Sequence, residues 1–117
     1  MRHDQEGDRD GGDAVEDVFT GLADPTRRRI LDLLARYGSG TATSLAAELP
    51  VSRQAVVKHL TVLDRAQLVV GQQIGREVRY RINPGPLEVT ARWMSARAAD
   101  WDRRLGEVKR LAEKDED

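Results

Sequence analysis

The sequence predicts a small, mainly helical domain that also contains one β-hairpin. Its 117 residues fit a single domain. Through most of the chain, apolar residues recur at intervals of three and four, which is the period of an amphipathic helix. Around residues 77–82 the pattern changes to strict alternation, which is the period of a half-buried strand. A long helical stretch then closes the chain.

Composition excludes several classes of protein. The chain has no cysteine, so a disulfide framework, a thiolate metal site and a cysteine nucleophile are all excluded. Its apolar runs are far shorter than the ~20 residues of a membrane span, and no signal-peptide pattern is visible at the start. We therefore expect a cytoplasmic protein. A single core is marginal at this length, which favours dimerisation.

Charge is strongly segregated along the chain, although the net charge is only −1. Residues 1–24 carry two bases against eight acids, and residues 25–82 carry ten against four. Residues 83–117 are nearly balanced, with seven bases and eight acids. A basic middle therefore lies between acidic ends, and this asymmetry needs a functional explanation.

The first half of the chain predicts three helices. Residues 1–12 are rich in Asp and Gly and are expected to form a disordered acidic tail. A short helix is expected over about 13–23. Asp24 as N-cap and Pro25 at the first helical position predict the start of a second helix, which Gly38 ends. A third, short helix is expected from about Thr43 to Glu48, before Pro50.

The next segment predicts a helix-turn-helix. Ser52 is the expected N-cap of a helix over 52–66, whose inward positions repeat at i, i+4 and i+7 and whose outer face is polar and basic. A β-hairpin is expected to follow, with strands at Leu68–Gly71 and Glu77–Ile82 and a turn over Gln73–Arg76. Helices followed by a basic hairpin predict a winged helix-turn-helix.

The final helix is expected over about 86–112, with a charged tail at 113–117. Two interleaved seven-residue repeats form an a/d-like seam, Leu87, Met94, Trp101 and Val108 with Ala91, Ala98, Leu105 and Ala112. Such a helix is ~40 Å long and exceeds what its own domain can cover. A second copy is therefore the expected partner, and packing within one chain is the alternative. The expected dimerisation residues of this helix are Leu87, Ala91, Met94, Ala98, Trp101, Leu105 and Val108.

Three segments, in this order and spacing, resemble a known family. They are FTGLADPTRRRIL at 19–31, VSRQAVVKHL at 51–60 and GREVRY at 75–80. Across about residues 15–112 the chain resembles the ArsR-type (arsenic-repressor-like) winged-helix transcriptional regulators, in the branch without metal-site cysteines. The resemblance implies a homodimeric DNA-binding repressor of prokaryotic type that dimerises through its first and last helices. It therefore adds Val15, Val18 and Phe19, from the first helix, to the expected dimerisation residues. It also implies that the helix at 52–66 enters the major groove and that the hairpin contacts the DNA backbone or minor groove.

The expected DNA-binding residues follow from this docking: Ser52, Arg53, Gln54, Val57, Lys58, His59, Thr61, Arg76 and Arg79. Arg53 and Gln54 stand at the first turn of the helix, which reaches base edges. There arginine pairs with guanine and glutamine with adenine. Lys58 is better suited to a phosphate than to a base edge, because its ammonium group is a point charge without the two fixed donors that arginine presents. Arg76 is expected to be the most exposed basic residue of the hairpin.

Several positions admit two interpretations or depart from the family. Val57 stands where a serine is usual, and it either meets a thymine methyl group or is a tolerated substitution. His59 either contacts DNA or is a packed structural residue. Gln67 replaces the glycine that usually takes the left-handed conformation after the helix.

The three arginines at 27–29 oppose the dipole of their own helix, so a structural role is expected for them. Arg28 is placed to pair with Asp32 at i+4, and its neighbours with Asp24 or with the acidic first helix.

The sequence lacks catalytic and metal-sensing patterns. Cys pairs on the third helix and His sets on the last helix, which metal-sensing relatives use, are missing. A planar Cu(II) or Ni(II) site at Met1-Arg2-His3 is expected to be incidental. Ser52 and His59 lie two turns apart on one helix, too far for a nucleophile and its base, so we expect no enzyme and no cofactor.

We therefore expect a sequence-specific DNA-binding regulator that acts as a homodimeric repressor. Its expected target is an inverted-repeat operator, which could be the operator of its own gene. The alternative is a dimeric winged-helix module that binds proteins and has no sequence-specific DNA binding. The sequence does not identify a small-molecule effector.

Overall fold

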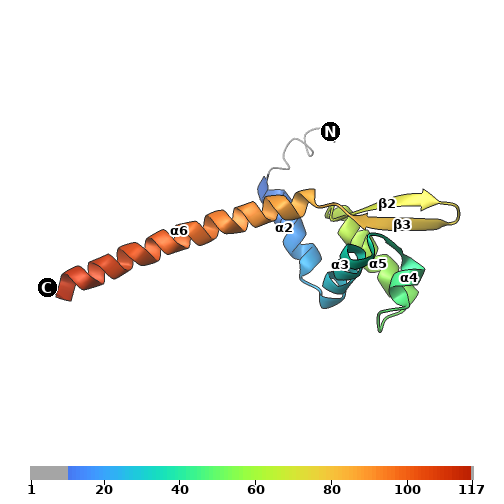
Figure 1. Ribbon diagram of the computed structural model, residues 1–117, viewed down its shortest axis with the longest axis horizontal. Coiled ribbons are helices and arrows are strands. Elements are labelled where there is room, and N and C mark those ends of the chain that lie inside the picture. Colours follow the sequence, from blue (N-terminus) through green and yellow to red (C-terminus); the bar gives the residue numbers. More distant parts are fainter. Residues whose placement is uncertain (1–10, 117) are drawn as a thin grey trace.

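The computed structural model describes residues 11–116, which form a compact head and a long projecting helix (Figure 1). The helices are α2 (Gly11–Leu22), α3 (Pro25–Tyr37), α4 (Ala42–Ala46), α5 (Arg53–Arg65) and α6 (Gly85–Glu116). The strands are β1 (Gly40–Thr41), β2 (Val69–Ile74) and β3 (Glu77–Ile82). The predicted winged helix-turn-helix with a long C-terminal helix is confirmed. Residues 1–10 of the expected acidic tail lie outside the described residues.

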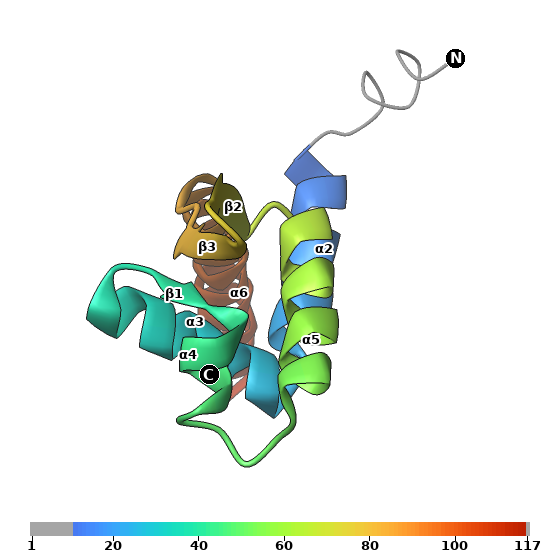
Figure 2. The same ribbon diagram turned by 90° about the vertical axis from the view of Figure 1, so that its right-hand side faces the viewer.

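The core of the head lies where α2, α3 and α5 pack together, as Figure 2 shows from the end of the molecule. Its fully buried side chains are Val18, Ile30, Leu34, Val56, Leu60, Leu63 and Leu68. The inward face predicted for α5 from its periodicity is therefore confirmed, and in α3 the buried residues are Ile30, Leu31 and Leu34. Burial of this apolar surface fixes the orientation of α5, and with it the face that α5 presents to solvent.

Side-chain caps set the beginnings of the helices in the head. The Asp24 carboxylate accepts hydrogen bonds from the backbone N–H groups of Thr26 (2.7 Å) and Arg27 (3.1 Å). These bonds, that from Arg27 foremost, hold the pKa of Asp24 below its usual value. The Ser52 hydroxyl accepts from the N–H of Ala55 at 3.1 Å and starts α5. Both predicted N-caps are confirmed.

The short helix α4 begins with a capping box that the sequence analysis did not identify. Thr41 accepts a hydrogen bond from the N–H of Ser44, whose hydroxyl accepts in return from the N–H of Thr41. The helix ends at Ala46, earlier than the expected Glu48, and the chain continues in a tighter turn in which the N–H of Glu48 donates to the carbonyl of Leu45 at 3.1 Å. Pro50 lies beyond it and does not end it directly.

The wing, defined as β2, β3 and their turn, differs from the predicted hairpin. The strand predicted at Leu68–Gly71 runs from Val69 to Ile74, so the turn comprises only Gly75 and Arg76. Its second half is exposed on both faces, so no alternation of apolar and polar residues marks that part of the strand in the sequence. A third strand, β1, pairs with β3 at Gly40↔Tyr80 and was not predicted. Two residues are too few to carry a periodic signal.

The connection from α5 to β2 keeps the expected left-handed turn, although a glutamine occupies it. Gln67 has φ of +63°. The N–H of Leu68 donates to the backbone carbonyl of Leu63 at 2.9 Å, and the N–H of Gln67 donates to the backbone carbonyl of Asp64 at 3.0 Å. This pair of bonds is the Schellman arrangement at a helix end. Gln67 adopts a backbone conformation that costs an L-residue about 1 kcal/mol.

The last helix, α6, is a single uninterrupted helix of 32 residues, about 48 Å long. It continues past the expected end at 112 because no residue there stops it, and the expected charged tail is helical up to Glu116. Its first turns pack on α2, where the rings of Phe19 and Trp93 meet edge to face at 5.8 Å. The remainder leaves the head, and the chain is 73 Å long. No helix within residues 11–116 is long and apolar enough to cross a membrane.

We predict that Gln67→Gly stabilises the protein. Glycine adopts positive φ without the Cβ clash, and the Gln67 side chain is exposed, so little packing is lost. The free energy of unfolding should rise by roughly 0.5–1 kcal/mol in urea denaturation at fixed protein concentration. Gly38→Ala is the matched control, because Gly38 has φ of +83° with open space around it. It should destabilise the fold, and an unchanged or lower midpoint for Gln67→Gly would contradict the account.

Candidate nucleic-acid interface

The outer side of α5 carries a continuous set of exposed polar side chains. Because Val56, Leu60 and Leu63 are buried in the core, the opposite stripe of the helix faces solvent. We call this stripe the reading face, which consists of Arg53, Gln54, Val57, Lys58 and Thr61. All five were predicted as contact residues, and the structure places them together on one surface. Ser52 stands at the beginning of the same helix as its cap.

Two residues of the reading face are bonded within the protein, and two are not. The Arg53 Nε donates to Thr43 Oγ1 at 3.1 Å, which ties α5 to α4 across the helix-turn-helix. Thr61 Oγ1 donates to the carbonyl of Val57 at 3.0 Å, so its proton is engaged by its own helix and its oxygen can only accept from a ligand. Gln54 and Lys58 make no side-chain hydrogen bond within the described part of the chain. Their donors and acceptors remain available to a ligand.

The wing brings a second arginine beside the reading face. A cleft of about 300 Å³ separates α5 from β3, and Arg53, Val57 and Arg76 all line it. Leu60, Val78 and Tyr80 contribute its apolar walls. Two guanidinium groups from residues 23 positions apart therefore flank one groove. Such a groove suits a polyanion, because arginine binds phosphate through paired donors.

Arg79 lies apart from this groove. Side chains alternate along a strand, so Arg79 stands on the opposite face of β3 from Val78 and Tyr80. Its Nη1 donates to Ser39 Oγ at 3.2 Å, next to β1. The structure thus joins Arg76, but not Arg79, to the reading face.

His59 belongs to the interior side of α5. It is half-buried, and its Nδ1 lies 3.4 Å from Nη1 of Arg27. Because arginine can only donate, Nδ1 is the acceptor in this contact. Of the two interpretations of His59, the geometry favours the structural one.

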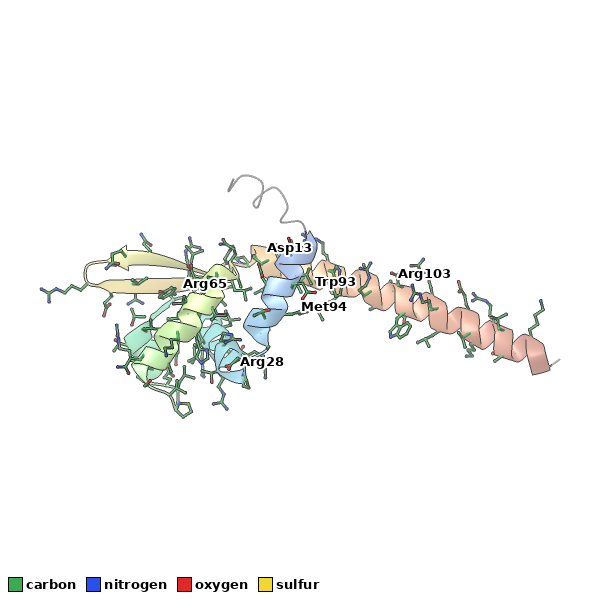
Figure 3. The ribbon with its side chains drawn as sticks, turned by 180° about the vertical axis from the view of Figure 1, so that it is seen from behind. Asp13, Arg28, Arg65, Trp93, Met94 and Arg103 are labelled. Carbon is green, nitrogen blue, oxygen red and sulfur yellow. The ribbon has the colours of Figure 1, made fainter. Side chains whose placement is uncertain are left out.

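Arg27 and Arg28, at the start of α3, make contacts within the protein, but their partners differ from those expected. Arg27 donates from Nε to the carbonyl of Gly21 at 2.9 Å and from Nη2 to that of Thr20 at 2.8 Å. Arg28, labelled in Figure 3, donates to the carbonyl of Leu22 at 2.6 Å rather than to the Asp32 carboxylate. The last carbonyls of α2 have no partner within the helix and carry its negative dipole end. These carbonyls therefore attract the positively charged arginine side chains in the first turn of α3.

The expected dimerisation residues divide into two groups. Val15 and Val18 are 3% and 0% exposed in the single chain, so they leave no free surface for a second copy. Phe19 packs on Trp93, and Leu87 packs partly against the core. The other residues are exposed along α6, and we call them the seam: Ala91, Met94, Ala98, Trp101, Leu105 and Val108.

Figure 3 shows the seam leaving the head, with Met94 beside α2 and Arg103 well beyond it. Leu111, also exposed, extends the apolar stripe and was missed because it lies one position off the seven-residue repeat. An ion-paired group, Arg97 and Arg103 with Asp100, covers part of the remaining surface.

No three His, Asp or Glu side chains of residues 11–116 gather in a way that would hold a metal ion. The Met1-Arg2-His3 terminus lies outside the described residues.

Comparison with known proteins adds independent findings. Residues 22–72 match a family described as "Helix-turn-helix domain". The chain is 34% identical over 80 residues to the transcriptional repressor SdpR of Bacillus subtilis, covering 68% of this chain and 88% of that protein. It is 43% identical over 67 residues to the regulator Rv2034 of Mycobacterium tuberculosis, covering 57% and 62%. A solved ArsR-like transcriptional regulator from Rhodococcus sp. RHA1 superimposes with a TM-score of 0.79 at 46% identity, covering 86% of this chain and 92% of that one.

We predict that Arg27→Gln destabilises the head. The substitution removes two charged hydrogen bonds to carbonyls of α2 and the contact with His59. The free energy of unfolding should fall by about 2 kcal/mol in urea denaturation. Arg29→Gln removes the same charge from an exposed neighbour and should change it by less than about 0.5 kcal/mol. Equal effects of the two substitutions would show that charge, and not the bonds to α2, governs the result.

Proposed function

The chain belongs to the ArsR family of winged helix-turn-helix transcriptional regulators, and from this premise we propose that it is a homodimeric repressor that binds an inverted-repeat operator in double-stranded DNA. One observation carries the proposal. The exposed reading face of α5 and the wing line a single groove, to which α5 contributes Arg53 and the wing contributes Arg76 beside Glu77.

In this proposal α5 enters the major groove and its first turn meets the base edges. Arg53 is suited to guanine and Gln54 to adenine, each through two hydrogen bonds. Lys58 and Arg76 are suited to phosphates, which fix the position of the protein without selecting a sequence. The basic middle of the chain, with a net charge of +6 over residues 25–82, supports this division.

The seam supports the homodimer. Trp101, Leu105 and Val108 are each about 60% exposed on a helix that has left its own head. A single chain leaves this apolar stripe in water, whereas a second copy related by a two-fold axis covers it. Two heads held in this way match an inverted repeat with half-sites about one helical turn, ~34–36 Å, apart.

A dimeric module that binds proteins instead of DNA is the competing function. Fluorescence anisotropy with the DNA upstream of the protein's own gene distinguishes the two, because regulators of this kind often control their own operon. Specific binding that weakens steeply with salt supports the repressor. Failure to shift any promoter fragment at micromolar protein would favour the interaction module.

We predict that substitutions in the reading face and in the wing have different effects. Arg53→Ala and Gln54→Ala remove base contacts, so the preference for operator over scrambled DNA should fall by roughly tenfold for each. Arg76→Ala removes a phosphate contact, so all sequences should bind more weakly. The slope of log K against log salt should then flatten by about 0.9 per phosphate lost. The measurement is an anisotropy titration at several salt concentrations, and a sequence-dependent loss for Arg76→Ala would contradict the assignment.

We predict that Trp101→Glu abolishes the dimer but leaves the folded head intact. Trp101 is 62% exposed in the single chain, so the charge is tolerated in a monomer but not in a paired seam. Light scattering after size exclusion should show a monomer with unchanged helix content. Ala96→Glu adds the same charge on the opposite side of α6 and should remain dimeric. A wild-type monomer at micromolar concentration would refute the homodimer.

A further inference from the structure

Val57 is an apolar side chain in the middle of a surface otherwise built from polar and charged groups. It is 40% exposed, and it stands between Arg53, one turn before it, and Thr61, one turn after it. Its side chain is not needed for the core, which is formed by the opposite side of α5. The exposed valine therefore contributes little to folding and is available to a ligand.

Apolar side chains line part of the cleft beside Val57. Ala42 and Leu60 contribute them from the helix-turn-helix, and Val78 and Tyr80 contribute them from β3. The hydrogen-bonding groups of the same cleft belong to other residues, among them Arg53 and Arg76. A group that touches the Val57 side chain itself meets only methyl carbons.

Among the base edges exposed in the major groove, only thymine presents an apolar group, its 5-methyl. A guanine, adenine or cytosine edge against Val57 would lose water without gaining a hydrogen bond. We propose that Val57 is a specificity-determining residue that selects thymine in each half-site by packing against this methyl group. The inference rests on the proposed DNA-binding function and deepens it by naming the base that this position selects.

The experiment replaces thymine by deoxyuracil, which deletes the methyl group and leaves the hydrogen-bonding edge unchanged. An operator is first selected from a random DNA pool with the full-length protein, and each thymine is then substituted in both half-sites. At one thymine position, wild-type affinity should fall roughly fourfold per half-site, the value for one methyl group removed from apolar contact, and about 15-fold for the pair. At the other thymine positions it should stay within about twofold.

Two variants assign this effect to Val57. Val57→Ser should bind the thymine and deoxyuracil operators equally, and its selected pool should lose the preference for thymine at that position. Val57→Ile keeps an apolar side chain and should keep the discrimination. Because the side chain is exposed, both variants should unfold at the wild-type denaturant midpoint, which is measured alongside.

The outcomes separate this inference from the proposed function. If the wild-type protein prefers its operator but binds every deoxyuracil form equally, DNA binding stands and the role of Val57 is overturned. If Val57→Ser still discriminates, another group contacts the methyl and the inference is likewise overturned. If no DNA sequence is preferred over scrambled DNA, the proposed function fails, and the inference fails with it.

Discussion

The junction between α2 and α3 organises this molecule. The last carbonyls of α2 face the first turn of α3, and Arg27 joins them with two hydrogen bonds while contacting His59 on α5. Asp24 caps the same turn from the other side. One arginine therefore links α2, on which the first turns of α6 pack, to α5, which bears the reading face. The two functional surfaces keep a fixed relation because their supporting helices meet at this point.

The division between buried and exposed apolar residues separates folding from function. The head is closed by residues such as Ile30, Leu34 and Leu60, which are essentially inaccessible to water. The seam and Val57 remain exposed, although burial would be favourable for both. Exposed apolar surface of this extent on a small domain indicates a binding site. The seam suits a second protein chain, and Val57 suits a nucleic acid.

Local signals in the sequence predicted most of the fold. Asp24 and Ser52 cap helices a few residues away, and the buried stripe of α5 determines its exposed face, so both could be predicted. Interactions between distant segments could not. The strand β1 exists only because β3 pairs with it, and Arg28 bonds a carbonyl of the preceding helix rather than a nearby acid. The meeting of Arg53 and Arg76 across one cleft likewise depends on how the wing packs, which no spacing in the sequence records.

The length and continuity of α6 have a mechanical consequence. A helix of 32 residues without a break is a stiff rod about 48 Å long, and its first turns are held against α2. A deviation of about 10° in this packing angle would displace the far end of the rod by roughly 8 Å, which exceeds two base-pair steps of DNA. The contact between Phe19 and Trp93 therefore helps to set the direction in which the exposed stripe of α6 leaves the head.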